Sequence, residues 1–303
     1  MSTENHYTIP GTVELGNGEG GMPVFRIRNE FAHCEIYAYG AHVSSFRPAG
    51  QEDLLWMSPT SVYRAGVPLR GGVPVCFPWF GPHRTRTDLP LHGLVRTRFW
   101  SPKQAARLSD GRTLLVLGFS DDSQTRAVWP YAFRIELKVL VGRDLEIELS
   151  VENSGEDPFR YEDCLHAYLR VGSARGCGVI GLDGISYIDR LLGDRRAVQV
   201  GTVRLGTETV NAYMRSPPCC ILDDTSLSRR IRVEQEGFTS TVVWNPGEKA
   251  AAKNPEIGAA WDEYVCIEPA NCLDSPVLLP PGTSHRSRMR LIQETRPEAA
   301  VGT

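Results

Sequence analysis

The sequence of 303 residues lacks the marks of export and of membrane insertion. Its first residues, MSTENHYTIPG, contain no basic stretch followed by an apolar run, and no segment approaches the roughly 18 apolar residues of a membrane span. The formal net charge is only −3, so no overall positive field draws the chain to nucleic acid or to an anionic membrane. We therefore expect a cytoplasmic protein that binds neither nucleic acid nor a membrane.

The common metal-ligand spacings are also missing. The eight cysteines include no C-x-x-C pair, and no two of the seven histidines are separated by a single residue. Without an export signal, eight cysteines are typical of reduced, buried thiols and not of four disulfides. The sequence therefore predicts no metal site and no disulfide framework.

Long segments with a 3.6-residue apolar period are absent, and alternation with a period of two takes their place. Apolar residues occupy every second position from Ile135 to Val141 and again from Leu145 to Val151, on either side of a turn at residues 142–144. This pattern predicts an antiparallel hairpin with one buried face. The best helical candidates are short, such as the segment NPEIGAAWDEY.

Domain boundaries are equally hard to find. Glycine and proline, 29 and 21 residues, are spread along the whole chain, as expected for many short strands joined by turns. There is no Gly/Ser-rich linker, low-complexity tract or repeat. We expect a single all-β domain over residues 1–303, a large antiparallel β-sandwich with short frayed tails at both ends.

Three separated segments carry residues suited to acid–base chemistry. His92 lies in a loop within LPLHGLVR, directly before a glycine. In CLHAYLRVG, alternation places Leu165 and Ala167 on the core face and His166 on the opposite face. In YVCIEPAN, Val265 and Ile267 face the core, Glu268 points the other way, and the following proline is expected to end the strand.

Each of these residues alone is more often structural than catalytic. A strand histidine is commonly a satisfied structural side chain, and a glutamate before a strand-ending proline is commonly solvated. Together, however, they supply a general base and a general acid. An ordinary glutamate is ionised at pH 7, and a histidine beside that carboxylate has its pKa raised, so we expect Glu268 to accept a proton and His166 to deliver one.

The segment from Arg70 to Trp100 is rich in arginine, aromatic residues, glycine and proline. Between Tyr63 and Arg98 there are six arginines and no lysine. Guanidinium groups bind phosphate through paired hydrogen bonds, and aromatic rings stack on the apolar face of a sugar. This composition favours a sugar phosphate as the ligand, with Phe77 or Trp79 as the stacking ring.

The ordered set RGGVPVCFPWFGP, LPLHGLVRTRFW, WPYAFRIELKVLVG, LHAYLRVG and VCIEPAN resembles the motifs of the hexose-6-phosphate mutarotases. These glucose-6-phosphate 1-epimerases are a branch of the aldose 1-epimerase, galactose mutarotase-like superfamily. The resemblance covers roughly residues 20–293. Its most specific part is the R-G-G-x-P-x-x-x-P-W-F-G-P block together with H-G-x-x-R.

The resemblance implies a β-sandwich, the superfamily's supersandwich, that interconverts the α and β anomers of a hexose 6-phosphate without metal or organic cofactor. Glu268 matches the family's general base at the anomeric hydroxyl, and His166 matches the acid that protonates the ring oxygen. His92 matches a second histidine that contacts the sugar. Arg70 and Arg96 match the arginines that bind the substrate through its phosphate. We expect a monomer whose partner is a small hexose phosphate.

Two positions depart from the family pattern. Leu91 stands where the family often has glutamine before H-G, which removes a hydrogen-bonding side chain beside the ligand. In VNAY, Val210 and Asn211 stand at the Asp and Arg positions of a D-R-x-Y segment. Val210 carries no charge, whereas Asn211 retains the capacity to contact a hydroxyl. These changes leave the acid–base pair intact and bear on the identity of the sugar.

Two other functions compete with the mutarotase. A catalytically silent binder of sugars or sugar phosphates on the same fold is favoured by Leu91 and Val210, but such a binder has no reason to keep both His166 and Glu268. A metal-dependent, cupin-like enzyme would use His83, His92, His166 and Glu268, but cupin-type sites place two histidines one or two residues apart on one strand. The mutarotase therefore ranks first and the metal enzyme last.

Overall fold

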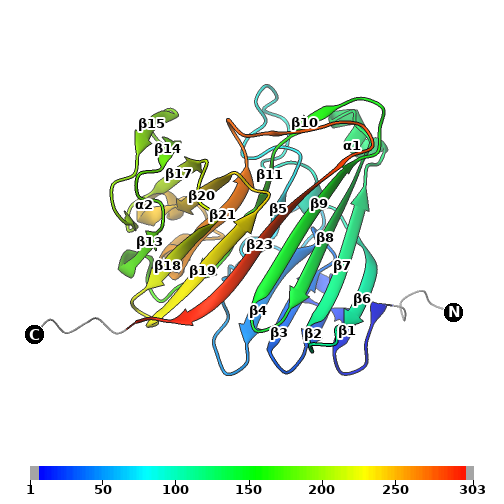
Figure 1. Cartoon of the computed structure of the whole chain (residues 1–303), viewed down its shortest axis with the longest axis horizontal. Helices are drawn as coiled ribbons and strands as arrows, with labels where there is room; N and C mark the ends of the chain where they lie inside the picture. Colours follow the sequence, from blue (N-terminus) through cyan, green and yellow to red (C-terminus); the bar gives the residue numbers. More distant parts are fainter. Residues whose placement is uncertain (1–6, 298–303) are drawn as a thin grey trace, which may run out of the picture.

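The computed structural model describes residues 7–297 of the chain. Most of these residues belong to antiparallel strands, so the predicted all-β sandwich is confirmed (Figure 1). The residues at the extreme ends of the predicted frayed tails, 1–6 and 298–303, lie outside this range. Within it, no helix has the length and the apolar character needed to cross a bilayer.

One layer of the sandwich is a nine-stranded antiparallel sheet in the order β16-β13-β18-β19-β23-β9-β8-β7-β6. Its strand β23 is the longest and runs diagonally between β9 and β19 (Figure 1). The predicted hairpin is confirmed, because β8 and β9 pair along their whole length and close at Val141 and Leu145. The strands are β6 (Ser101–Arg107), β7 (Thr113–Ser120), β8 (Phe133–Val141), β9 (Leu145–Asn153), β13 (Cys177–Ile180), β16 (Val203–Arg204), β18 (Cys219–Asp224), β19 (Arg229–Glu236) and β23 (Ser284–Thr295).

The opposite layer combines a four-stranded and an eight-stranded sheet, which an isolated bridge between Val43 and Val73 connects. The four-stranded sheet is β1 (Val13–Asn17), β2 (Pro23–Arg28), β3 (Ala32–Tyr37) and β4 (His42–Pro48). The eight-stranded sheet runs β15-β14-β17-β20-β21-β11-β5, with β12 also on β21. Its strands are β5 (Val75–Cys76), β11 (Asp163–Leu165), β12 (Tyr168–Arg170), β14 (Ser186–Asp189), β15 (Arg195–Val198), β17 (Thr209–Met214), β20 (Ser240–Asn245) and β21 (Tyr264–Asn271).

Short elements complete the described chain. Strands β10 (Phe159–Tyr161) and β22 (Val277–Leu279) pair with each other. Two short α-helices occur in residues 7–297, α1 (Ser123–Val128) and α2 (Gly247–Ala251). The 3₁₀ segments are Glu19–Gly21, Val95–Thr97, Ala174–Gly176 and the longer Gly258–Glu263. The helical candidate NPEIGAAWDEY thus contains only a 3₁₀ segment, Gly258–Glu263.

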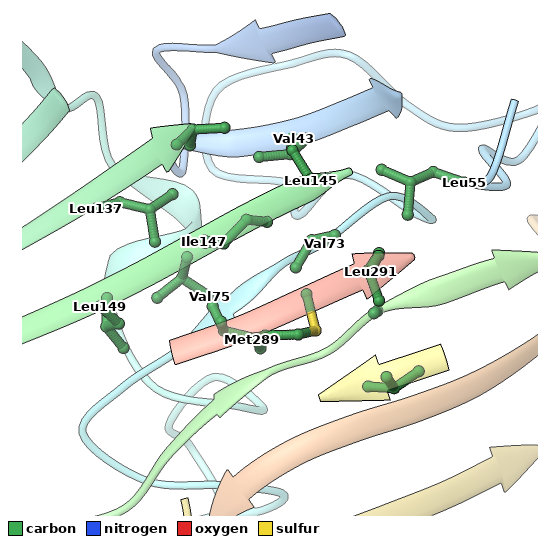
Figure 2. Packing of buried hydrophobic residues seen from close by; sticks show 14 of the residues in the cluster. Val43, Leu55, Val73, Val75, Leu137, Leu145, Ile147, Leu149, Met289 and Leu291 are labelled. Atoms are coloured by element: carbon green, nitrogen blue, oxygen red, sulfur yellow. The ribbon is translucent and has the colours of Figure 1, made fainter. Parts of the chain in front are cut away.

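The main core lies between the two layers. Its side chains are the alternating apolar residues of facing strands, as Figure 2 shows for Val43, Val73 and Val75 beside Ile147, Met289 and Leu291. Each is at most 1 % exposed. Fully burying such a side chain contributes about 1.5–3 kcal/mol, so this interface sets the register of both layers.

A buried polar link joins the layers near the centre. Asn271 on β21 donates to Asp163 Oδ1 over 2.9 Å, and Ser287 on β23 in the other layer donates to Asp163 Oδ2 over 3.4 Å. All three side chains are at most 1 % exposed. Burial raises the pKa of Asp163 to about 7, although the Asn271 and Ser287 hydrogen bonds favour its ionised form.

Candidate active site

Two parallel rows of side chains cross the eight-stranded sheet on its outer face. Tyr168 pairs with Cys266 between β12 and β21, and Cys164 pairs with Ala270 between β11 and β21. The same register places His166, between β11 and β12, opposite Glu268. Since directly opposed side chains point to the same face, the first row is His166, Glu268, Val242 and Ala212. The second is Tyr168, Cys266, Trp244, Val210 and Arg190.

Apart from Cys266, which is fully buried behind them, the residues of these rows form the floor of a cleft of about 260 Å³. Side chains from loops close its rim, namely Arg70, Phe80, Leu91, His92 and Leu273. The predicted alternation is confirmed on both sides of the sheet, because Leu165, Ala167, Val265 and Ile267 lie in the main core behind the cleft. A sheet that is buried on one face therefore presents His166 and Glu268 on the other.

Pro269 does not end its strand, and the expectation that it would is wrong. Strand β21 continues through Pro269 to Asn271, and Pro269 pairs with Thr241 of β20. On the side of β11 and β12, Pro269 has no N–H to donate to Leu165, which lies opposite in the register. The Leu165 carbonyl accepts from Ala167 N over 2.9 Å instead. The ladder is thus interrupted at His166, whose N–H donates to Pro74 O over 3.0 Å.

His166 and Glu268 form a close, buried pair. His166 Nδ1 lies 3.5 Å from Glu268 Oε1, and the two side chains are 8 % and 1 % exposed. The other carboxyl oxygen, Oε2, accepts from the Cys164 thiol over 3.5 Å. The His166 ring stacks on Tyr168 with 4.8 Å between centroids and an interplanar angle of 11°. Stacking on Tyr168 therefore orients the His166 ring, and the hydrogen bond from the Cys164 thiol orients the Glu268 carboxyl group.

The expected pKa directions of this pair are wrong for the cleft as it stands. Burial, with a smaller contribution from the nearby cations Arg96 and Arg70, lowers the pKa of His166 to about 3. Burial likewise raises the pKa of Glu268 well above its ordinary value. Desolvation of both partners thus outweighs their mutual attraction and favours the neutral form of each side chain.

His92 is a neutral neighbour of the pair. Its ring meets the His166 ring edge-on at 5.3 Å between centroids, and its Nδ1 accepts from Gly81 N over 3.2 Å. Burial lowers the His92 pKa well below its ordinary value, and His166 and Arg96 add to this effect. With Nδ1 used as an acceptor, the ring carries its proton on Nε2. Gly93 is required next to it, because at φ +83 any Cβ there would clash with the Phe77 carbonyl.

Arg70 lines the cleft and Arg96 does not, but both bring positive charge near His166 and His92. Arg70 donates to the Tyr168 hydroxyl over 3.3 Å and to Glu256 Oε2 over 3.2 Å. Arg96 donates to the Leu91 carbonyl over 2.7 Å, and within residues 7–297 no carboxylate lies within ion-pair distance of its guanidinium. Burial lowers the pKa of Arg96, as expected for a cation without a counter-ion. An anionic ligand would neutralise it.

Of the other predicted contact residues, Leu91 lies at the cleft and Asn211 does not. Leu91 lies on the rim and is 47 % exposed. Asn211 is not brought to the cleft, because it alternates with Val210 and Ala212 on β17 and faces the other way, like core residue Tyr213. Sequence reasoning missed Arg190, which follows β14, donates its N–H to Val210 O over 3.0 Å and lines the cleft. The positive charge on this side of the cleft therefore comes from Arg190, which follows β14, and not from the VNAY segment on β17.

The expected stacking rings are also different. Phe77 is fully buried in an aromatic cluster with Trp129, Phe133 and Tyr161, so it cannot stack on a ligand. Trp79 is 7 % exposed and donates to Pro90 O outside the cleft. The apolar walls come instead from Phe80, Tyr168 and Trp244. The alternation of Val242 and Trp244 in STVVWN was the available signal for the last of these.

The four-residue metal set of the cupin-like alternative is not assembled. His83 lies in an exposed loop, where its Nδ1 accepts from Thr85 N and Arg86 N, outside the cleft. In the described part of the chain, the group with metal-ligand proximity is His166, Cys266 and Glu268. A larger cleft of about 540 Å³ elsewhere is lined by side chains that pair with one another, such as Arg26 and Glu35 at 2.9 Å.

The chain is similar to known proteins over most of its length. The family model described as aldose 1-epimerase matches residues 23–291. A protein of Escherichia coli K12 named "Putative glucose-6-phosphate 1-epimerase" is 34 % identical over 233 residues, which cover 76 % of this chain and 77 % of that protein. A protein of Cenchrus ciliaris with the same name is 30 % identical over 289 residues, covering 92 % and 87 %.

A solved structure resembles the whole chain. The crystal structure of a "putative mutarotase (YeaD)" from Salmonella typhimurium superposes with a TM-score of 0.89 at 26 % identity. The match covers 96 % of each chain. The similarity therefore includes the strands that carry both rows of the cleft.

Proposed function

This chain belongs to the aldose 1-epimerase family, and from that premise we propose that it interconverts the α and β anomers of a hexose 6-phosphate, with glucose 6-phosphate as the first candidate. Membership of the family supports a mutarotase acting on a sugar. The observation that supports a phosphate ligand is the pair of arginines near His166; one of them, the half-buried Arg96, has no carboxylate partner within residues 7–297.

In the proposed reaction, Glu268 removes the proton of the anomeric hydroxyl while His166 protonates the ring oxygen. The C1–O5 bond then breaks, the open-chain aldehyde rotates about C1–C2, and the reverse proton transfers close the ring as either anomer. No net proton is gained or lost, because the two side chains exchange roles between opening and closing. His166 Nδ1 and Glu268 Oε1 lie 3.5 Å apart on the floor of the cleft, so the acid and the base are side by side.

Substrate binding prepares the pair for this step. Burial favours a neutral His166 and a protonated Glu268 in the ligand-free cleft. A phosphate dianion beside Arg70 and Arg96 offsets the contribution of these cations to the low His166 pKa, whereas the larger contribution, from burial, remains. The phosphate thus favours the reactive form of the pair, with an imidazolium at His166 and a carboxylate at Glu268, in addition to binding the substrate.

The remaining cleft residues fit a sugar ring. The walls from Trp244, Tyr168 and Phe80 supply apolar faces for the ring, and the His92 Nε2–H and Arg190 supply donors for hydroxyls. The C6 phosphate lies on the side of O5, which is the side of His166, Arg70 and Arg96. Arg190, at the far end of the second row, then faces the ring hydroxyls.

The testing experiment is anomer exchange measured by NMR magnetisation transfer, on glucose 6-phosphate, glucose and galactose, with EDTA present throughout. Acceleration over the spontaneous rate for the phosphorylated sugar, and little for the free sugars, is the expected outcome. Equal acceleration of all three would remove the phosphate from the proposal. Acceleration of none would favour a silent binder, which a binding measurement with glucose 6-phosphate would then establish.

A further inference from the structure

A third potential metal ligand lies beside the acid–base pair. Cys266 is two residues before Glu268 on β21 and faces the same side of the sheet. The Cys266 Sγ, one Glu268 carboxyl oxygen and one ring nitrogen of His166 all lie within 4.8 Å of one another. The proposed reaction uses the nitrogen and the oxygen but has no role for the thiol.

The donor atoms are buried and poorly satisfied. His166 Nδ1 has no hydrogen-bond partner in residues 7–297, although the side chain is only 8 % exposed. Cys266 is fully buried, packed with Trp56, Tyr168 and Tyr264. An unpaired buried nitrogen is costly, so a ligand that accepts its lone pair is favoured.

The geometry is close to that of a tetrahedral zinc site. Zn–S is about 2.3 Å and Zn–N or Zn–O about 2.0–2.2 Å, so tetrahedral donors lie roughly 3.3–3.7 Å apart. His166 Nδ1 and Glu268 Oε1 are already at 3.5 Å, and the thiol has to approach by at most about 1.5 Å. His166 and Glu268 line the cleft and Cys266 lies behind them, so a fourth ligand would come from the cleft.

We propose that Cys266, His166 and Glu268 form a binding site for Zn²⁺ that inhibits the protein. One thiolate, one imidazole and one carboxylate select a thiophilic cation and reject Mg²⁺ and Ca²⁺, which need six or more oxygen ligands. Binding of Zn²⁺ releases the thiol proton of Cys266 and the carboxyl proton of Glu268 to the solvent. The bound ion occupies the lone pair of His166 and an oxygen of Glu268, so neither group can exchange protons with a sugar. Free of the metal, the thiol takes no part in the reaction.

The first test measures binding and does not depend on the proposed function. Full-length protein is stripped with chelator, transferred to chelator-free buffer and titrated with Zn²⁺ by calorimetry, and separately with Co²⁺ by absorption spectroscopy. We expect one Zn²⁺ per chain, a thiolate-to-cobalt charge-transfer band, and no displacement by millimolar Mg²⁺. The Cys266→Ala variant should bind Zn²⁺ about 10–100-fold more weakly, or worse, and lose the band.

Two further variants make the result decisive. Cys219→Ala removes a partly exposed thiol on β18, remote from the cleft, and should leave binding and the cobalt band unchanged. Cys266→Ser keeps the side-chain volume if the alanine variant fails to fold, and should also lose the band. Equal Zn²⁺ affinity in wild type and the Cys266 variants, or an absent cobalt band in the wild type, would overturn the proposal.

The second test measures inhibition by Zn²⁺ and rests on the proposed function. Zn²⁺ should slow anomer exchange competitively with glucose 6-phosphate, and EDTA should restore the full rate. In Cys266→Ala the uninhibited rate should be near that of the wild type, while the inhibitory Zn²⁺ concentration rises by the same 10–100-fold factor as in calorimetry. If the protein binds Zn²⁺ as described but exchanges no anomers, the site stands and only the proposed function fails.

Discussion

Replacing Glu268 by glutamine isolates the proposed base from the rest of the cleft. Glutamine has the same size, and its carbonyl can still accept from the Cys164 thiol. Its amide can donate to His166 Nδ1, which lies 3.5 Å from Oε1 and has no hydrogen-bond partner in the described residues. We therefore expect the free energy of unfolding to change by less than about 1 kcal/mol, the net value of one hydrogen bond.

The catalytic effect should be large. A positioned general base contributes about 10²–10⁴-fold, equivalent to about 2.7–5.5 kcal/mol of barrier. Glu268→Gln should therefore reduce the enzyme-dependent rate of anomer exchange by that factor, because glutamine cannot accept the hydroxyl proton. Affinity for glucose 6-phosphate should remain within a few-fold, since Arg70 and Arg96 are unchanged. Magnetisation transfer gives the rate, and calorimetry on the same samples gives the affinity.

Glu162→Gln is the matched control. Glu162 is also a buried glutamate, 7 % exposed, but it pairs with Arg84 over 2.6 Å and accepts from Phe80 N and Leu273 N, which position the rim. Its loss should lower stability and weaken binding while leaving the rate at saturation largely intact. A Glu268→Gln variant that keeps more than a tenth of the rate, or a control that loses as much, would refute the assignment.

Three other expectations follow from the same contacts. Arg70→Ala should weaken binding of glucose 6-phosphate by about 10–150-fold, the value of charge-assisted hydrogen bonds of about 1.5–3 kcal/mol, and should weaken binding of glucose far less. Arg134→Ala, which removes an exposed arginine of β8 in the other layer, where it pairs with Glu152, is the control. Equal losses for both sugars would contradict the phosphate role. Met289→Ala should cost about 2–5 kcal/mol in urea unfolding, because it leaves a cavity between the layers, and a smaller cost would mean that the layers readjust. Because burial raises the pKa of Asp163 to about 7, the folded state binds this proton more tightly than the unfolded state does. The contribution of Asp163 to the free energy of unfolding is therefore greatest below about pH 4 and falls by a few kcal/mol as the pH rises through 7. Asp163→Asn should abolish this pH dependence and keep part of the contacts with Asn271 and Ser287.

Local alternation accounts for most of what the sequence predicted correctly. The hairpin of β8 and β9, and the outward direction of His166 and Glu268, follow from a period of two that a buried face imposes on each strand. These features depend on neighbours within a few residues. The same locality led to the wrong expectation at Pro269, because proline is tolerated where the opposing strand pair is interrupted, which the sequence of one strand does not reveal.

The rest depended on contacts between distant segments. Arg190 lines the cleft because β14 pairs with β17. Phe77 lies in the core and not in the cleft because Trp129 and Tyr161 pack around it. The pKa directions of the acid–base pair depend on how completely both groups leave water, which residue types alone do not determine. Composition predicted a phosphate-binding region, but which of its arginines lie near His166 depends on the fold.

The register that places His166 opposite Glu268 is the register that buries Leu165, Ala167 and Ile267. A slip of one residue between these strands would turn the histidine into the core and the aliphatic side chains outward, so such a molecule would lose stability and chemistry together. Molecules with the wrong strand register thus lack both a packed core and the candidate site. The fraction of molecules that bind ligand in a preparation would therefore equal the fraction with correctly paired strands.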